Sequence, residues 1–269
     1  MRVNASCKLR TLGAVLPALL LSACPLPPHA PAPPPAAAAP PAETPAPHEG
    51  IPYDIVADES LLIIRVYRGG ALASAGHNHV IASHALGGTV YVPGDLKRAS
   101  FEIRFPVAEL TIDEAALRER ENRADFPPEV PEAARQGTRR NMLGEALLDG
   151  EHHPQIVLRA LRLVPAVAAM PAAGEAGATS RAETADPAGE AGTVLARVQT
   201  TVRGEVRAII VPVSYRLAGG EVTASGEAAV RQSDLGLTPF SAMLGALQVQ
   251  DEMKVSFRIV ARNLPPRSK

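Results

Sequence analysis

Apolar and polar residues alternate with a period of two in several segments of the chain. The alternation is clearest over residues 101–105 and 253–259, where charged or hydroxyl residues separate the apolar ones. Successive side chains of a β-strand point to opposite faces, so this pattern predicts two strands that each have one buried face and one wet face. The predicted buried faces consist of Phe101, Ile103, Phe105, Met253, Val255, Phe257 and Ile259.

Weaker alternation predicts further strands over residues 61–67, 89–92, 156–163, 194–202, 205–217 and 221–231. The last two are joined by Ala218-Gly219-Gly220, a connection typical of a hairpin. Successive strands with short turns favour an antiparallel sheet, and a large sheet removes its exposed edges by closing on itself. The pattern therefore predicts an all-β protein with an antiparallel β-barrel.

Two short helices are expected to interrupt the strands, over residues 113–121 and 141–148, with a proline-rich break between them. Residues 164–192 contain few large apolar side chains, and we expect them to form a disordered loop insertion. The barrel domain is expected to span residues 51–263.

The first residues have the plan of an export signal. Basic residues precede a short apolar run that ends in Leu21-Ser22-Ala23-Cys24. This ending resembles the bacterial lipobox, which implies a lipoprotein signal peptide over residues 1–23 and lipidation of Cys24. Cleavage near Ala23 without lipidation is the alternative. Because Pro25 is not acidic, resemblance to the usual sorting pattern favours the outer membrane, with the protein facing the periplasm.

Residues 24–50 hold the lipidated cysteine and a stretch rich in proline and alanine, which predicts an extended tether. His29 and His48 are interpreted as solvated residues of this linker. Cys7 lies in the segment expected to be removed, so the mature protein would retain one cysteine and no internal disulfide.

Composition argues against nucleic acid as a partner. The formal net charge is −1, aromatic residues make up 3% of the chain and tryptophan is absent. The protein therefore has neither a strong positive potential nor many aromatic rings with which to bind a nucleic acid.

Three motifs resemble those of the YceI-like family of exported bacterial lipid-binding proteins. They are residues 230–237 (VRQSDLGL) followed by the strand over 249–260, residues 152–158 (HHPQIVL), and residues 76–79 (GHNH). Gln232 stands where the family usually has arginine, and Leu235 where it has phenylalanine. The resemblance implies a lipocalin-like barrel of about eight strands that can hold a polyisoprenoid chain such as a quinone tail.

The leading hypothesis is non-catalytic binding, carriage or sequestration of a long apolar amphiphile in the periplasm or cell envelope. The seven apolar residues named above are expected to face this ligand, and His77 and His79 to position structure or a ligand head group. The alternative for the seven is a solid barrel core without a cavity. No cofactor is expected beyond a bound isoprenoid lipid, and the sequence leaves open whether the protein forms a homodimer.

Other functions remain as alternatives. His77 and His79 would share one face of a strand, so a metal or redox site could use them, with His84 or the pair His152 and His153 adding a ligand. An enzyme is not expected, because the sequence has no Gly-x-Ser-x-Gly nucleophile motif. A structural lipoprotein that binds only proteins is the last alternative.

Overall fold

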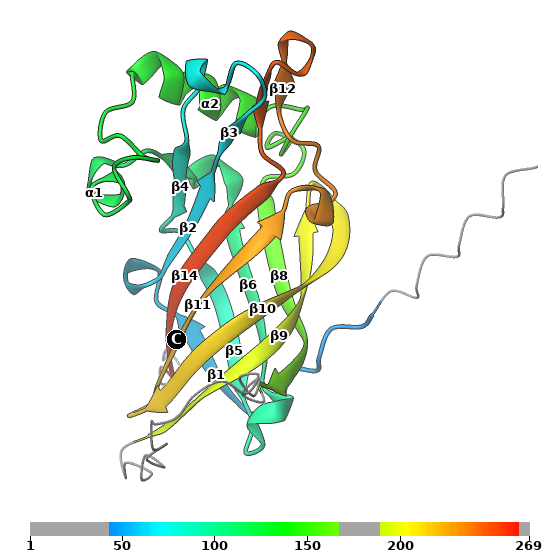
Figure 1. The fold of residues 1–269 in the computed structure, drawn as a ribbon. Helices are drawn as coiled ribbons and strands as arrows, with labels where there is room; N and C mark the ends of the chain where they lie inside the picture. Colours follow the sequence, from blue (N-terminus) through cyan, green and yellow to red (C-terminus); the bar gives the residue numbers. More distant parts are fainter. Residues whose placement is uncertain (1–42, 167–188, 264–269) are drawn as a thin grey trace, which may run out of the picture. The chain divides into compact units, whose positions relative to one another are not determined.

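Eight strands of the described chain close into an antiparallel barrel (Figure 1). The computed structural model describes residues 43–166 and 189–263. The predicted signal peptide, Cys24 and His29 lie outside the described residues, as do most of the predicted tether and residues 167–188 of the predicted loop. None of the helices described is long and apolar enough to span a bilayer.

The strands are β1 Ile51–Ile55, β2 Leu61–Val66, β3 Arg68–Gly69, β4 His79–Ser83, β5 Gly87–Val92, β6 Ser100–Pro106, β7 Thr111–Ile112, β8 Gln155–Pro165, β9 Glu190–Val202, β10 Glu205–Ala218, β11 Glu221–Arg231, β12 Ser241–Ala242, β13 Leu247–Val249 and β14 Glu252–Arg262. The α-helices are α1 Ala115–Arg118 and α2 Glu132–Leu143. Single 3-10 turns are η1 Ala57–Glu59, η2 Ala73–Ala75, η3 Leu96–Arg98, η4 Val107–Glu109, η5 Ser233–Leu235 and η6 Met243–Gly245.

The barrel runs in the order β1-β5-β6-β8-β9-β10-β11-β14 and closes where β14 pairs with β1. One edge of β14 serves two partners, because its middle pairs with β2 and its end pairs with β1. From β2 the sheet continues outside the ring through β4 to β7. A separate small sheet consists of β12, β13 and β3. The predicted antiparallel barrel of about eight strands is confirmed.

Each strand predicted from alternation is present, with ends that differ by a few residues. The longest hairpin joins β9 and β10, whose register runs from Val202 opposite Glu205 to Glu190 opposite Leu217. Pro212 lies inside β10 and has no N–H to donate, and the pairing of β10 with β11 ends nearby at Ser214 opposite Ser225. The proline thus lies just beyond the point where the hydrogen bonding between β10 and β11 ends.

Both predicted helices need correction. The helix predicted over 141–148 is wrong, because α2 starts directly after Pro131 and ends at Leu143, where Gly144 takes an extended conformation. The helix predicted over 113–121 is only the short α1. Asp113 cannot begin it, because its backbone has a φ of 55° and its carboxylate is occupied by a buried polar network.

The described ends of the predicted tether and loop contact the barrel or extend its strands. Residues 43–50 pack on the barrel: Ala46 N donates to the carbonyl of Ala160 at 2.8 Å, and Glu43 forms an ion pair with Arg197. His48 is exposed but stacks on Tyr91, with ring centroids 4.3 Å apart, so it is not a free linker residue. β8 enters the first end of the predicted loop, where its pairing with β9 continues to Pro165. β9 enters the other end, where its pairing with β10 begins at Glu190.

Candidate functional site: an apolar cavity inside the barrel

The barrel is not a solid core, because its interior holds a cavity of about 320 Å³. Small-molecule sites usually have volumes of ~300–1,000 Å³, so this cavity lies within the range of a ligand site. Every apolar residue predicted to face a ligand lines it. These residues are Phe101, Ile103, Phe105, Met253, Val255, Phe257 and Ile259.

The cavity follows the length of the barrel. At one end its wall includes Leu163 and Val194, which lie near the end of β8 and the start of β9. At the other end Met142 of α2 and Leu148 of the following turn complete the wall. α2 lies at the same end as β3 and β12 (Figure 1). A cavity of this form suits a slender ligand.

The wall contains few polar groups. Apart from Thr200, Gln232 and Tyr215, the lining side chains are hydrocarbon or thioether, and none of the described ones has a carboxylate, ammonium, guanidinium or imidazole group. Gln232 Nε2 already donates to the carbonyl of Gln250 at 2.8 Å. Burial raises the pKa of Tyr215 further above neutrality, so its phenol also adds no charge to the wall. The cavity therefore favours an uncharged hydrocarbon ligand.

His77 and His79 do not line this cavity, which corrects the expectation that both imidazoles face the lumen or its mouth. β4 begins only at His79, so the two residues do not share one face of a strand. Their ring centroids are 6.1 Å apart. Burial lowers the pKa of His77, which is only half-buried and precedes the strand.

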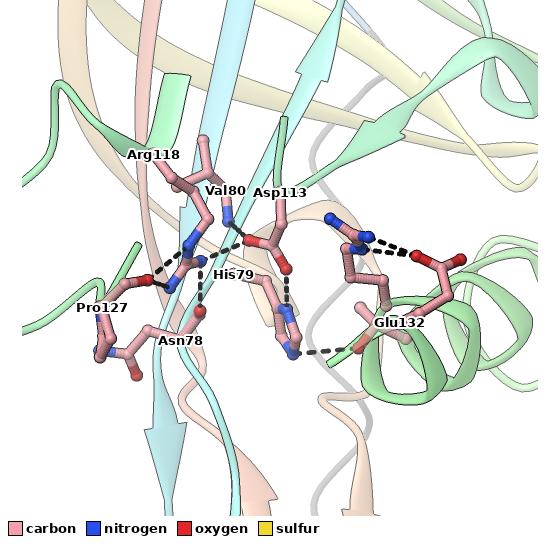
Figure 2. A network of polar contacts seen from close by, with 9 residues as sticks. Asn78, His79, Val80, Asp113, Arg118, Pro127 and Glu132 are labelled. Atoms are coloured by element: carbon pink, nitrogen blue, oxygen red, sulfur yellow. Dashed lines mark hydrogen bonds and ion pairs between the residues drawn. The ribbon is translucent and has the colours of Figure 1, made fainter. Parts of the chain in front are cut away.

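His79 instead belongs to a buried polar network, shown in Figure 2. Its Nδ1 lies 2.6 Å from Asp113 Oδ2, and its Nε2 lies 3.0 Å from Thr138 Oγ1 on α2. A carboxylate only accepts, so Nδ1 carries the hydrogen. Both ring nitrogens are thus occupied, and the contact to Thr138 fixes α2 to the start of β4.

Asp113 holds the centre of this network. Its Oδ1 accepts from Val80 N at 2.9 Å and from Arg118 Nη1. Arg118 is 1% exposed and also donates to the carbonyls of Asn78 and Pro127. Burial alone would raise the pKa of Asp113, but the hydrogen bonds from His79 and Val80 and the charge of Arg118 outweigh it and hold the pKa below its usual value.

The other histidines proposed as metal ligands are engaged separately. His84 Nε2 lies 3.0 Å from Glu114 Oε1, and His152 Nδ1 lies 2.8 Å from Asp149 Oδ1. Across residues 43–166 and 189–263, no group of three or more His, Cys, Asp or Glu side chains is placed to hold a metal ion. The metal alternative therefore gains no support from the described residues.

Sequence reasoning missed Asp113, Arg118 and Thr138. They lie on three different elements or turns, so no spacing along the chain joins them. Asp113 itself was visible in the sequence, but it was interpreted as the start of the predicted helix. Only the fold brings its carboxylate to His79.

The chain matches no family model and no curated protein. Among solved structures, it is similar to BcnA of Burkholderia cenocepacia, with a TM-score of 0.49 and 14% identity over 77% of this chain and 99% of that chain. A polyisoprenoid binding domain from Saccharophagus degradans has a TM-score of 0.47 and 11% identity, covering 79% of this chain and 98% of that chain. The YceI protein of Campylobacter jejuni has a TM-score of 0.40 and 8% identity, covering 67% and 82%.

Proposed function

We propose that the protein binds and carries, or sequesters, a long uncharged amphiphile in its barrel without catalysing a reaction. The observation that carries this proposal is the cavity of about 320 Å³, whose wall is almost entirely apolar. Each buried CH₂ group contributes ~0.8 kcal/mol, so a long hydrocarbon chain gains ample affinity from such a wall without charged contacts. The resemblance of the sequence motifs to the YceI-like family favours a polyisoprenoid or quinone-like lipid.

The barrel geometry also favours a chain over a bulky ligand. An eight-stranded barrel is only wide enough to be filled by its own side chains or to hold one small ligand. Here the cavity extends along the strands from Leu163 to the residues of α2, so its long direction follows the barrel. A flexible or extended hydrocarbon fits this space better than a fused ring system.

Solvent extraction of the protein purified from its native envelope, followed by mass spectrometry, tests this proposal. We expect close to stoichiometric amounts of one class of long-chain amphiphile, because a dry apolar cavity has no better occupant in a membrane-containing cell. Protein delipidated in detergent should take the same lipid up again from mixed micelles. Absence of both copurifying lipid and uptake would contradict the proposal and favour a protein that binds only other proteins.

We further propose that the barrel is exported and tethered to the envelope through acylated Cys24, with the outer membrane as its site. Cys24→Ala is expected to shift the protein from the membrane fraction to the soluble fraction or leave it unprocessed, because the acyl chains would supply the anchor. Fractionation and intact mass measure both effects. Cys7→Ala, inside the segment expected to be removed, is the matched control and should leave mature mass and fractionation unchanged. Soluble wild-type protein without acyl mass would refute the anchor.

A further inference from the structure

Two neighbouring loops at the α2 end of the barrel contain no charged residue. They are residues 70–76, in the connection between β3 and β4, and residues 235–250, which run from the last residue of η5 to the residue before Asp251. In the whole chain, charged residues make up 20%. Surface loops normally carry such charges, so their absence from two adjacent loops marks an unusual surface.

The same loops expose large apolar side chains. Leu244 is fully exposed, Met243 is 70% exposed and Leu72 is 45% exposed. β13 pairs with both β12 and β3, and Leu72 N donates to the carbonyl of Ala246 at 2.8 Å. These contacts place the two loops side by side. We call Leu72, Met243 and Leu244 the apolar tip.

The backbone holds this tip in an outward-turned form. Met243 and Leu244 have φ angles of 52° and 55°, in the left-handed region that residues with a Cβ rarely adopt. Gly70, with a φ of 85°, allows the loops to approach each other, because a Cβ there would lie 2.4 Å from the carbonyl oxygen of Ala246. Exposing two apolar side chains on a strained backbone contributes no stabilising free energy in water. This arrangement suits a surface that becomes covered when the protein binds another surface.

We propose that the apolar tip inserts into the interfacial region of a lipid bilayer. A bilayer accepts apolar side chains readily and penalises charges, so loops without any charged residue suit it better than they suit a typical protein interface, which has a polar rim. At the base of the loops Arg68 is exposed and donates to the carbonyl of Gly76, so this cationic side chain lies beside the uncharged segment and would suit lipid phosphates if the tip is inserted.

The loop that carries Met243 and Leu244 also contributes to the cavity wall. Leu235 and Leu237, at the start of the longer loop, line the cavity. Insertion of the tip would therefore bring this end of the barrel to the apolar phase in which a long-chain amphiphile resides. This consequence rests on the proposed function, whereas insertion itself does not.

The absence of tryptophan from the chain permits a direct test. Leu244→Trp in the full chain places a single tryptophan at the tip, and Ile210→Trp places one on the outer wall of the barrel, where Ile210 is 59% exposed. Both proteins are mixed with phosphatidylethanolamine–phosphatidylglycerol vesicles whose acyl chains carry bromine, which quenches nearby tryptophan. Because interfacial apolar groups lie ~5–10 Å into the headgroup and acyl boundary, we expect at least about twofold stronger quenching and a blue shift for Leu244→Trp alone.

Adding Met243→Ser to the Leu244→Trp chain should weaken the quenching, since it replaces the neighbouring apolar side chain of the tip by a polar one. Unquenched emission from Leu244→Trp, with or without a blue shift, or equal quenching at both positions, would overturn the proposal. Extraction of lipid from the same preparations reports separately on the cavity. Failure of membrane insertion and failure of cavity binding are therefore distinguishable.

Discussion

Val255→Asp is expected to empty the barrel of its ligand. Val255 lies half-buried in the cavity wall on β14, where the structure describes no cationic side chain that could pair with a carboxylate. An unpaired buried charge costs several kcal/mol, and a penalty of about 3 kcal/mol would lower ligand affinity about 100-fold. The ratio of extracted lipid to protein, measured by mass spectrometry, reports the loss.

Lys254→Asp is the matched control for this variant. Lys254 is the preceding residue of β14, is exposed, and lies opposite Arg65 on β2. An aspartate there faces water and an opposite charge across the strands, so lipid content should remain at the wild-type level. Far-ultraviolet circular dichroism of both variants verifies that the barrel persists. Equal lipid content in two folded variants would show that the ligand does not occupy the cavity.

Asp113→Asn is expected to lower the free energy of unfolding by about 3 kcal/mol, because it leaves the buried Arg118 guanidinium without its carboxylate. Arg118 keeps its contacts to the carbonyls of Asn78 and Pro127, but these oxygens carry no full charge. Urea unfolding followed by circular dichroism measures the change. Glu132→Gln removes an exposed ion pair with Arg135 on α2 (Figure 2) and should change stability by no more than about 0.5 kcal/mol.

The difference in the free energy of unfolding between the wild type and Asp113→Asn is expected to depend on pH. The pKa of Asp113 in the folded protein is below its ordinary value, so the unfolded chain takes up this proton first as pH falls. The stabilisation is therefore fully present above the unfolded pKa of ~3.9 and is lost as pH falls through the lower, folded pKa. The stability difference between wild type and Asp113→Asn should narrow below about pH 4. A difference that stays constant down to the acid transition would mean that the pKa of Asp113 is the same in the folded and the unfolded protein.

Local patterning determined most of the barrel. Alternation with a period of two is a property of neighbouring residues, so it located the main strands and assigned Phe101, Ile103, Phe105 and the apolar residues of β14 to the inner face. It could not show whether that face encloses a solid core or a cavity, because both need the same apolar residues. Whether the inner face encloses a cavity depends on how the sheet closes, which it does where β14 pairs with β1 beside its pairing with β2.

Features that depend on distant partners were not accessible from the sequence. α2 begins where Pro131 permits, and its apolar residues then complete a wall formed by strands far away in the chain. His79 was visible as a candidate for chemistry, but only the tertiary structure places it between Asp113 and Thr138, away from the lumen. The proline- and alanine-rich segment predicts an extended chain, and the contact of Ala46 with Ala160 decides where that chain joins the barrel. Sequence periodicity thus specified which side chains face inward, whereas contacts between distant residues decided what they enclose.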